Sequence, residues 1–282
     1  MVAIRRPQDN KFRLRPTDLG VIGQFHNISY ANGEYAHMSL VEDLAHQIAE
    51  AHRGGRHDVD ATPYSVLDRA AAYDVQLRVM QLLGETAGLY KTAIAPDGVG
   101  VAAPIYESRF GQSGAFKLPS TNVTGLELEV GLVLDRDLDV ETAHRDEIDI
   151  IEAIDYYFVG VEICGTRYVD RTIAGFNGGL ADGMSALGYV MNPVHRDLGA
   201  EIDDFEVQLS FAGRQIHAAP ARHSFGSVLA SFIAYAKNQN PAYPLKAGTI
   251  VTTGSLCGLV PITGTGRVVG QLGRYSVEFD IV

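Results

Sequence analysis

The sequence is poor in cysteine, in basic residues and in long apolar runs. Its 282 residues include two cysteines, Cys164 and Cys257, which are too few for a disulfide scaffold or a cysteine-rich zinc site. Lys and Arg number 23 against 34 Asp and Glu, and this net charge of −11 argues against a nucleic-acid or anionic-membrane partner. The sequence shows neither the run of about 20 apolar residues that spans a bilayer nor the apolar core of a secretory signal. We therefore expect a soluble, cytoplasmic protein.

The pattern of apolar residues divides the chain into three regions. Residues 1–36 have weak periodicity and are interrupted by Gly and Pro, so they are expected to form a surface arm. Residues 37–90 carry two helical patterns and are expected to form a layer packed on the main domain. Residues 91–282 are expected to form a β-rich domain that holds the chemistry.

The two helices of the expected layer have recognisable ends. Ser39 and Glu42 form a capping box at the start of the first helix, and Gly54 with Gly55 ends it. The second helix is predicted over residues 62–84. Its expected apolar face consists of Val66, Ala70, Tyr73, Leu77, Met80 and Leu83.

Beyond this layer, short apolar runs alternate with Gly and Pro, which is typical of strands. Strands are predicted over residues 125–134, 157–164, 186–192, 206–213, 247–256, 265–272 and 275–282. Further helices are predicted over residues 144–155 and 224–238. Strands with an interposed helix or two indicate an α+β fold with a large, curled sheet.

The first candidate site lies in the run LELEVGLVL, residues 126–134. Side chains alternate along a strand, so Glu127 and Glu129 are expected on one face, roughly 7 Å apart, with Leu126 and Leu128 on the other. Two close carboxylates beside an apolar run favour a cation between them. An exposed polar strand face is the alternative.

A third carboxylate, Glu162, lies in the middle of the apolar run YYFVGVEIC. A buried ionised carboxylate costs several kcal/mol unless it is paired with a charge or bound to a metal. The alternative is an ordinary buried ion pair, for which Arg167 is the candidate partner of Glu162. Three carboxylates from apolar strands, without a His or Cys cluster, favour a hard cation such as Mg²⁺ or Mn²⁺.

Two further segments carry candidate chemistry. Lys91 is the only charge between Glu85 and Asp97, and it could act as a base if burial or a nearby dication lowered its pKa from the usual value of about 10.4. A surface lysine is the alternative. The run TIVTTGSLCGLVPI places hydroxyls and free amides at a strand end, which suits a carboxylate or oxyanion but is also compatible with an ordinary glycine turn.

Taken in order and spacing, these segments resemble the fumarylacetoacetate hydrolase superfamily, in its 2-keto-4-pentenoate hydratase and 4-oxalocrotonate decarboxylase branch. The resemblance runs from about Ser39 to Val282. It is strongest in LELEVGLVLDRDL, VEICGTRYVD, GLADGMSALGYVM and AGTIVTTGSLCGLVPI. It implies a mixed β-roll or sandwich with an N-terminal helical layer, a homo-oligomer, and a role in aromatic catabolism.

The resemblance also implies roles for individual residues. The metal ligands for Mg²⁺ or Mn²⁺ would be Glu127, Glu129 and Glu162, and Lys91 would act in proton transfer. The implied substrate-binding residues are Asp182, Ser185, Thr253, Gly254 and Ser255. The implied reaction is hydration of a small unsaturated 2-oxo acid through a metal-stabilised enolate.

The chain departs from the family pattern at two positions. The hydratases carry a catalytic Asp where this chain reads GVAAPI, with Val101 at the corresponding position. Glu107 is the nearest acid downstream and is the candidate replacement. Gly183 stands where the family has Asn after the aspartate of its Ala-Asp block.

Other functions remain open. One is a decarboxylase of a related 2-oxo acid, and another is a dehydratase of a 2-keto-3-deoxy sugar acid. A third is a C–C hydrolase, which needs a base such as His217 or His223, where a loop or lid is expected. A catalytically degenerate binding protein is the non-enzymatic alternative.

Overall fold

The computed structural model describes residues 40–192, 197–202 and 204–282, which belong to one compact unit, Leu40–Val282. The predicted arm over residues 1–36 and the predicted cap at Ser39 lie outside the described residues. Within the described ranges, no helix is both long and apolar enough to cross a membrane.

The first described helix covers residues 40–54 and ends as the sequence predicts. Gly55 takes a left-handed φ of +59°, which glycine adopts without strain. The next long helix, α2 (Arg69–Leu83), ends in the same way at Gly84, where φ is +69°. The 3.6-residue rhythm of the first helix predicts a stripe of Leu40, Val41, Leu44, Ile48 and Ala51, and all of these except the partly exposed Leu40 are buried.

The second helix is shorter than predicted and buries a different face. A short 3-10 turn, η1 (Thr62–Tyr64), precedes it, and the helix begins only after Asp68, whose carboxylate accepts a hydrogen bond from the Ala71 amide. Val66 therefore stays outside the helix with 78% of its surface exposed. The buried residues of α2 are Ala71, Ala72, Tyr73, Val75, Gln76 and Val79. Only Tyr73 belongs to the predicted face.

The described strands form two sheets. The larger has the order β2-β1-β10-β5-β6-β7-β3, with β11 paired to β5, and it mixes parallel and antiparallel pairs. The smaller has the order β4-β13-β12-β8-β9. Their bounds are β1 (Ala87–Ile94), β2 (Gly100–Tyr106), β3 (Phe110–Gln112), β4 (Lys117–Leu118), β5 (Gly125–Leu134), β6 (Ile154–Cys164), β7 (Ala186–Met191), β8 (Glu206–Phe211), β9 (Arg214–Pro220), β10 (Ile250–Ser255), β11 (Val260–Pro261), β12 (Gly266–Leu272) and β13 (Tyr275–Ile281).

All seven predicted strands are present, as β5, β6, β7, β8, β10, β12 and β13. β1, β2 and β9 were not predicted as strands. The expectation of a loop or lid around His217 is wrong, because that residue lies in β9, where it pairs with Leu209 of β8. His223 does follow the strand in a turn.

The predicted helix over residues 144–155 is also wrong in its bounds. Two short helices, α3 (Val140–Arg145) and α4 (Glu147–Glu152), occupy this region. Asp146 separates them, because its extended backbone breaks α3 and its carboxylate accepts from the Ile148 amide to start α4. Strand β6 already begins at Ile154.

The helix predicted over residues 224–238 is reduced to α6 (Ala230–Ala236). The preceding residues turn instead, because the Ser224 amide donates to the carbonyl of Ser255 and Gly226 takes a φ of +85°. The remaining short helices are α5 (Gly175–Ala181), η2 (Glu107–Arg109) and η3 (Gly183–Ser185).

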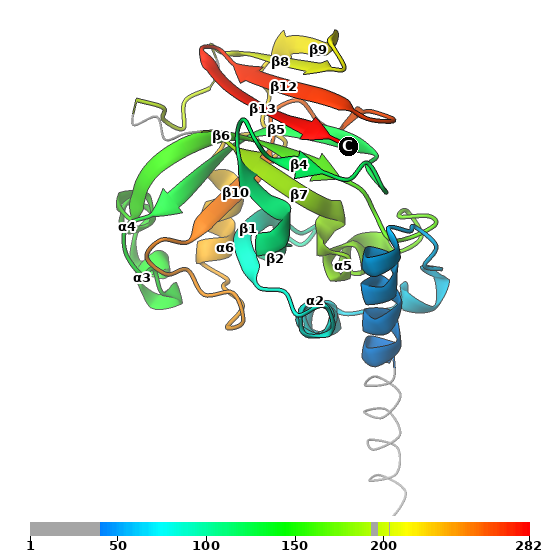
Figure 1. The fold of residues 1–282 in the computed structure, drawn as a ribbon. Helices are drawn as coiled ribbons and strands as arrows, with labels where there is room; N and C mark the ends of the chain where they lie inside the picture. The colour runs from blue at the N-terminus through cyan, green and yellow to red at the C-terminus, as the bar shows by residue number, and fades with distance from the viewer. Residues whose placement is uncertain (1–39, 193–196, 203) are drawn as a thin grey trace, which may run out of the picture. The chain divides into compact units, whose positions relative to one another are not determined.

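The larger sheet lies between the smaller sheet and the helices (Figure 1). One face packs on the smaller sheet, where Leu128 of β5 and Val161 of β6 share a core with Val268 and Phe279. The other face packs on α2, α5 and α6 in a second core. This arrangement confirms an α+β fold with mixed sheets and an N-terminal helical layer.

Candidate metal centre and active site

The carboxylates predicted to act together come from two paired strands. The antiparallel register of β5 and β6 places Glu127 directly opposite Glu162, and Glu129 opposite Gly160. Alternate residues Leu126 and Leu128 point into the core between the sheets, so the glutamates share the other face. Glu129 and Glu162 are fully buried, which removes the exposed polar strand face as an explanation.

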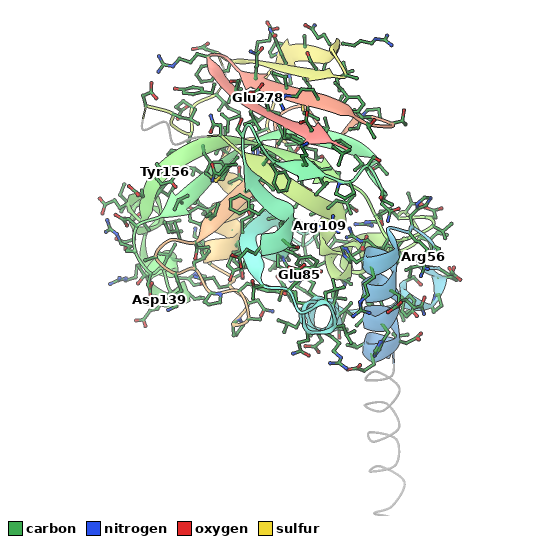
Figure 2. The ribbon with its side chains drawn as sticks, viewed as in Figure 1. Arg56, Glu85, Arg109, Asp139, Tyr156 and Glu278 are labelled. Atoms are coloured by element: carbon green, nitrogen blue, oxygen red, sulfur yellow. The ribbon has the colours of Figure 1, made fainter. Side chains whose placement is uncertain are left out.

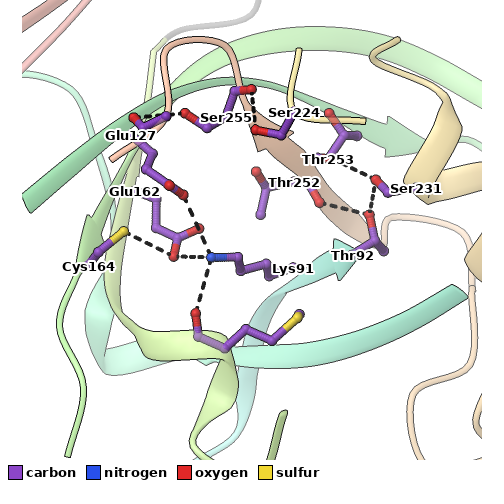
Figure 3. A network of polar contacts seen from close by, with 12 residues as sticks. Lys91, Thr92, Glu127, Glu162, Cys164, Ser224, Ser231, Thr252, Thr253 and Ser255 are labelled. Carbon is purple, nitrogen blue, oxygen red and sulfur yellow. Dashed lines mark hydrogen bonds and ion pairs between the residues drawn. The ribbon is translucent and has the colours of Figure 1, made fainter. Parts of the chain in front are cut away.

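Lys91 on β1 reaches into the same cluster (Figure 3). Its Nζ donates to Oε1 of Glu162 at 2.6 Å and to the backbone carbonyl of Met184 at 3.3 Å, and it lies 3.8 Å from Oε2 of Glu127. The lysine side chain is only 12% exposed, so the surface interpretation is wrong.

The alternative prediction of an ion pair between Arg167 and Glu162 is also wrong. Arg167 is buried and pairs with Asp182, which its Nε contacts directly. Oδ2 of Asp182 accepts further bonds from Thr166 Oγ1 at 2.7 Å and from the Arg167 amide at 3.1 Å. Lys91 is therefore the cation that accompanies Glu162.

One lysine does not balance three glutamates. Both oxygens of Glu129 and Oε2 of Glu162 are buried without a hydrogen-bond partner among the described residues. Burial, followed by the charge of Glu162, raises the pKa of Glu129 well above its usual value. Burial also raises the pKa of Glu162, to about 7, although Lys91 opposes the rise. In the absence of a further cation, Glu129 and Glu162 therefore hold protons more tightly than exposed glutamates do.

The pKa of Lys91 moves in the direction opposite to that needed for a base. Burial alone lowers it, but the charges of Glu162 and Glu127 together outweigh burial and raise it above the usual value. With no other cation beside it, Lys91 is an ammonium and a proton donor.

The sequence pattern gives Cys164 no role in the site. Cys164 lies two residues after Glu162 on the same face of β6, and its Sγ is 3.5 Å from Oε1 of Glu162. One ligand atom each from Glu127, Glu162 and Cys164 lies within 4.8 Å of the others. Burial raises the pKa of the thiol. Its position at i+2 from a site glutamate was a signal that could have been used.

Tyr189 is a further polar residue beside the glutamates that the sequence pattern did not indicate. Tyr189 on β7 pairs with Glu162 in the sheet, and burial, followed by the charge of Glu129, raises its pKa. Its hydroxyl lies near Thr252, but neither hydroxyl makes a geometrically sound hydrogen bond within the described ranges. Two polar atoms are thus left available beside the carboxylates.

The backbone that bonds to Lys91 is unusual. Gly183, Met184 and Ser185 take positive φ angles of 59°, 52° and 64° in succession. Left-handed backbone in non-glycine residues is uncommon and costs energy. Here it turns the Met184 carbonyl toward Lys91. The predicted substrate-binding residue Ser185 lies in this turn, and Asp182 lies at its start.

The predicted residues Thr253, Gly254 and Ser255 form an irregularity at the end of β10. The β10–β5 register shifts between Thr252 and Ser255, which brings Ser255 opposite Glu129. Gly254 has a φ of 120° and allows this bulge. Thr253 Oγ1 donates to the Val130 carbonyl at 2.7 Å. Substrate contact by these residues stays a prediction.

His223 lies next to this bulge. Its Nε2 is 3.3 Å from Thr253 Oγ1, and burial lowers its pKa to about 4. It is therefore neutral at physiological pH.

Glu107 and Val101 lie apart from these contacts. Glu107 is exposed in η2, and its Oε2 accepts from Thr86 Oγ1 at 2.9 Å. No hydrogen bond or ion pair in the described part of the chain joins it to Lys91 or to the glutamate cluster, and its catalytic role stays a prediction. Val101 on β2 is fully buried in the helix-side core.

Comparison with known proteins identifies relatives in sequence and in structure. No family model matches the chain. Over 205 residues the chain is 26% identical to 2-keto-4-pentenoate hydratase from Paraburkholderia xenovorans and, equally, to 2-keto-4-pentenoate hydratase 3 from Pseudomonas putida. Each match covers 70% of this chain and 74% of the relative.

Among solved structures, the chain is similar to 4-oxalocrotonate decarboxylase from Pseudomonas putida G7 in two complexes. The complex with calcium and acetate gives a TM-score of 0.70 at 20% identity, over 86% of this chain and 96% of the other. The complex with magnesium and adipate gives 0.71 at 19% identity, over 86% and 97%. The chain thus shares the fold of this decarboxylase. The resemblance to the 2-keto-4-pentenoate hydratase and 4-oxalocrotonate decarboxylase branch of the fumarylacetoacetate hydrolase superfamily is confirmed.

Proposed function

We propose that the chain is a divalent-metal-dependent lyase that hydrates a small unsaturated 2-oxo acid. The observation that carries this proposal is the excess of buried carboxylates over cations. Glu127, Glu129 and Glu162 share one face of two paired strands, and among the described residues Lys91 is the only cation paired with them. Burying such an excess of negative charge is costly unless a further cation is present.

The donor atoms fit a divalent ion. Three oxygens, those of Glu129 and Oε2 of Glu162, are buried without partners in residues 40–192, 197–202 and 204–282. Mg²⁺ and Mn²⁺ prefer such oxygen ligands, so Glu127, Glu129 and Glu162 would hold one of these ions. The similar decarboxylase has been seen with magnesium and with calcium, which supports a divalent ion here.

A bound ion would supply Lewis-acid polarisation of the carboxylate and 2-oxo oxygens of the substrate. The protein's own part in proton transfer falls to Lys91, whose Nζ borders the cluster and is held by Glu162 and Met184. As an ammonium, Lys91 would deliver the proton to C3 of the substrate when water adds. The hydroxyls of Tyr189 and Thr252, which have no hydrogen-bond partner among the described residues, are available to orient the substrate or the water.

Hydration is favoured over decarboxylation because both sequence relatives are hydratases. Both reactions move a proton to or from the carbon chain of the substrate, so the same residues would serve either. A C–C hydrolase that used His223 as its base is less favoured, because Nε2 of His223 lies against Thr253 Oγ1 rather than against Lys91 or the glutamates.

Calorimetric titration with Mg²⁺ or Mn²⁺, in the presence and absence of oxalate, tests the proposal. We expect metal binding, and oxalate binding only when metal is present. Glu127→Gln and Glu162→Gln should abolish both, whereas Glu278→Gln, on the exposed side of β13 (Figure 2), should change neither. Oxalate binding without metal would contradict the proposal. A scaffold that has lost activity should show no metal-dependent oxalate binding.

A screen of 2-oxo acids in the presence of metal then identifies the substrate. The readout is the loss or gain of enol absorbance. A hydratase consumes the unsaturated acid without releasing carbon dioxide. Carbon dioxide release at the same rate would assign the decarboxylase reaction instead.

A further inference from the structure

Cys164 lies on the same face of β6 as Glu162. Residues 160, 162 and 164 of β6 point to one face, and the residue between the last two, Ile163, lies in the core between the sheets. The Cys164 thiol therefore faces Glu162 and Glu127, and Cys164 belongs to none of the apolar cores of the described residues. A buried free cysteine that acts only as a small hydrophobe would be expected among apolar neighbours.

The spacing also suits a shared ion. Bonds of about 2.3 Å to sulfur and about 2.1 Å to oxygen, at a tetrahedral angle, place the two ligand atoms about 3.6 Å apart. In the metal-free structure the Cys164 thiol donates a hydrogen bond to Glu162 Oε1 at 3.5 Å, so an ion that replaced this proton would meet the two atoms at about the required separation. Glu162 also offers Oε2, which is fully buried and has no partner from the described chain, whereas Oε1 is held by Lys91. Both Glu162 and Glu129 thus point independently to a bound cation.

We propose that Cys164 is a further, direct ligand to the ion that the glutamates hold, so that the site binds thiophilic divalent ions such as Zn²⁺ or Co²⁺ in addition to Mg²⁺ or Mn²⁺. On binding, the S–H bond breaks, its electron pair forms the bond to the ion, and the proton leaves to solvent. The inference rests on the proposed function, because the ion is the one that the glutamates hold.

The second cysteine provides a matched control. Cys257 follows β10, and its Sγ lies 3.8 Å from Ser255 Oγ and 3.4 Å from the Gly258 carbonyl. It is not part of the group formed by Glu127, Glu162 and Cys164. A property that depends on a cysteine ligand should therefore follow Cys164 and not Cys257.

Titration of the metal-free protein with Co²⁺ tests this directly, because thiolate ligation gives a sulfur-to-cobalt charge-transfer band in the near ultraviolet. In the wild-type protein and in Cys257→Ser, we expect the absorbance of this band to saturate at one equivalent of Co²⁺. In Cys164→Ser and Cys164→Ala, we expect the band to be absent. Zn²⁺ affinity should fall at least about tenfold in Cys164→Ser, while Mg²⁺ affinity changes much less.

The absence of a band from the wild-type spectrum is decisive without any variant, whereas a band that is present is assigned to Cys164 or to Cys257 by the two serine variants. Stoichiometric Co²⁺ binding by calorimetry without a charge-transfer band would overturn the cysteine ligand but leave the proposed function standing. The absence of any Co²⁺, Mg²⁺ or Mn²⁺ binding would overturn both. A band that persists in Cys164→Ser and disappears in Cys257→Ser would also overturn the assignment.

Discussion

Lys91 and Glu162 form a buried ion pair, with Nζ and Oε1 2.6 Å apart, although two strands separate β1 from β6 in the sheet. Three strand spacings in a flat sheet amount to about 14 Å. The pair can form because both side chains are long and the larger sheet is curled (Figure 1). The curl thus brings Lys91 to carboxylates that lie far along the chain.

Replacing Lys91 by methionine should separate chemistry from metal binding. The variant loses the proton donor, so kcat should fall by about 10²- to 10⁴-fold. Metal affinity should stay the same or rise, because the ammonium beside Glu162 and Glu127 no longer repels the ion. Steady-state kinetics and calorimetry measure the two effects. Lys246→Met, which removes an exposed lysine paired with Asp137, is the control and should change neither. Loss of metal binding in Lys91→Met would contradict this role.

Replacing Glu129 by glutamine should stabilise the protein when metal is absent. The carboxylate is fully buried, and its oxygens have no partner among residues of the described ranges. We expect the metal-free free energy of unfolding to rise by about 1–3 kcal/mol, because the neutral amide costs less to bury. The increase in melting temperature that saturating metal gives the wild type should disappear. Equal metal stabilisation in both proteins would remove Glu129 from the site.

The metal-free protein should lose stability as the pH rises from about 4.5 to about 7. The pKa of Glu162 is raised to about 7 in the folded state, so the folded protein holds a proton that the unfolded chain has released. This contribution is fully present below pH 4.5, the ordinary pKa of Glu, and is lost as the pH passes through 7. Urea unfolding in the presence of a chelator measures it. Glu162→Gln should flatten the profile, and an unchanged slope would rule out Glu162 as the titrating group.

Replacing Tyr189 by phenylalanine should affect catalysis more than stability. The hydroxyl makes no hydrogen bond with described residues, so its loss should change the free energy of unfolding by less than about 1 kcal/mol. If it contacts substrate or water, kcat/KM should fall at least about tenfold. Tyr235→Phe is the opposite case, because that hydroxyl donates to the Tyr243 carbonyl at 2.7 Å. That control should lose about 1 kcal/mol and keep its activity.

Replacing Asp182 by asparagine should destabilise the protein by about 3–5 kcal/mol, because it leaves the charge of buried Arg167 without its counterion. Urea unfolding measures the change. The resemblance implied instead that Asp182 binds substrate. Unchanged stability with reduced kcat/KM would favour that role over a structural one.

Much of the fold followed from local patterns. The strands with clear alternation or bounded apolar runs, such as β5 and β13, were predicted within about a residue. The predicted bounds were wrong where a single capping side chain sets the end of a helix. Asp68 delays the start of α2, and Asp146 divides α3 from α4. Helical periodicity carries no information about which of several polar residues will act as the cap.

The site could be predicted only in part for a similar reason. Period-two alternation places Glu127 and Glu129 on one face, and an isolated acid in an apolar strand marks Glu162. The partner of Glu162 depends on how the sheet curls, and this is why Lys91 rather than Arg167 pairs with it. Tyr189 was missed because β7 reads as an apolar strand and its neighbour in the sheet is set by register.

X-ray diffraction from crystals of the protein soaked in Mn²⁺, with anomalous data collected near the manganese edge, tests the central claim most directly. We expect one anomalous peak bordered by carboxylate oxygens of Glu127, Glu129 and Glu162 at about 2.0–2.6 Å. Saturated crystals without a peak among these three residues, or with a peak at another place only, would contradict the account.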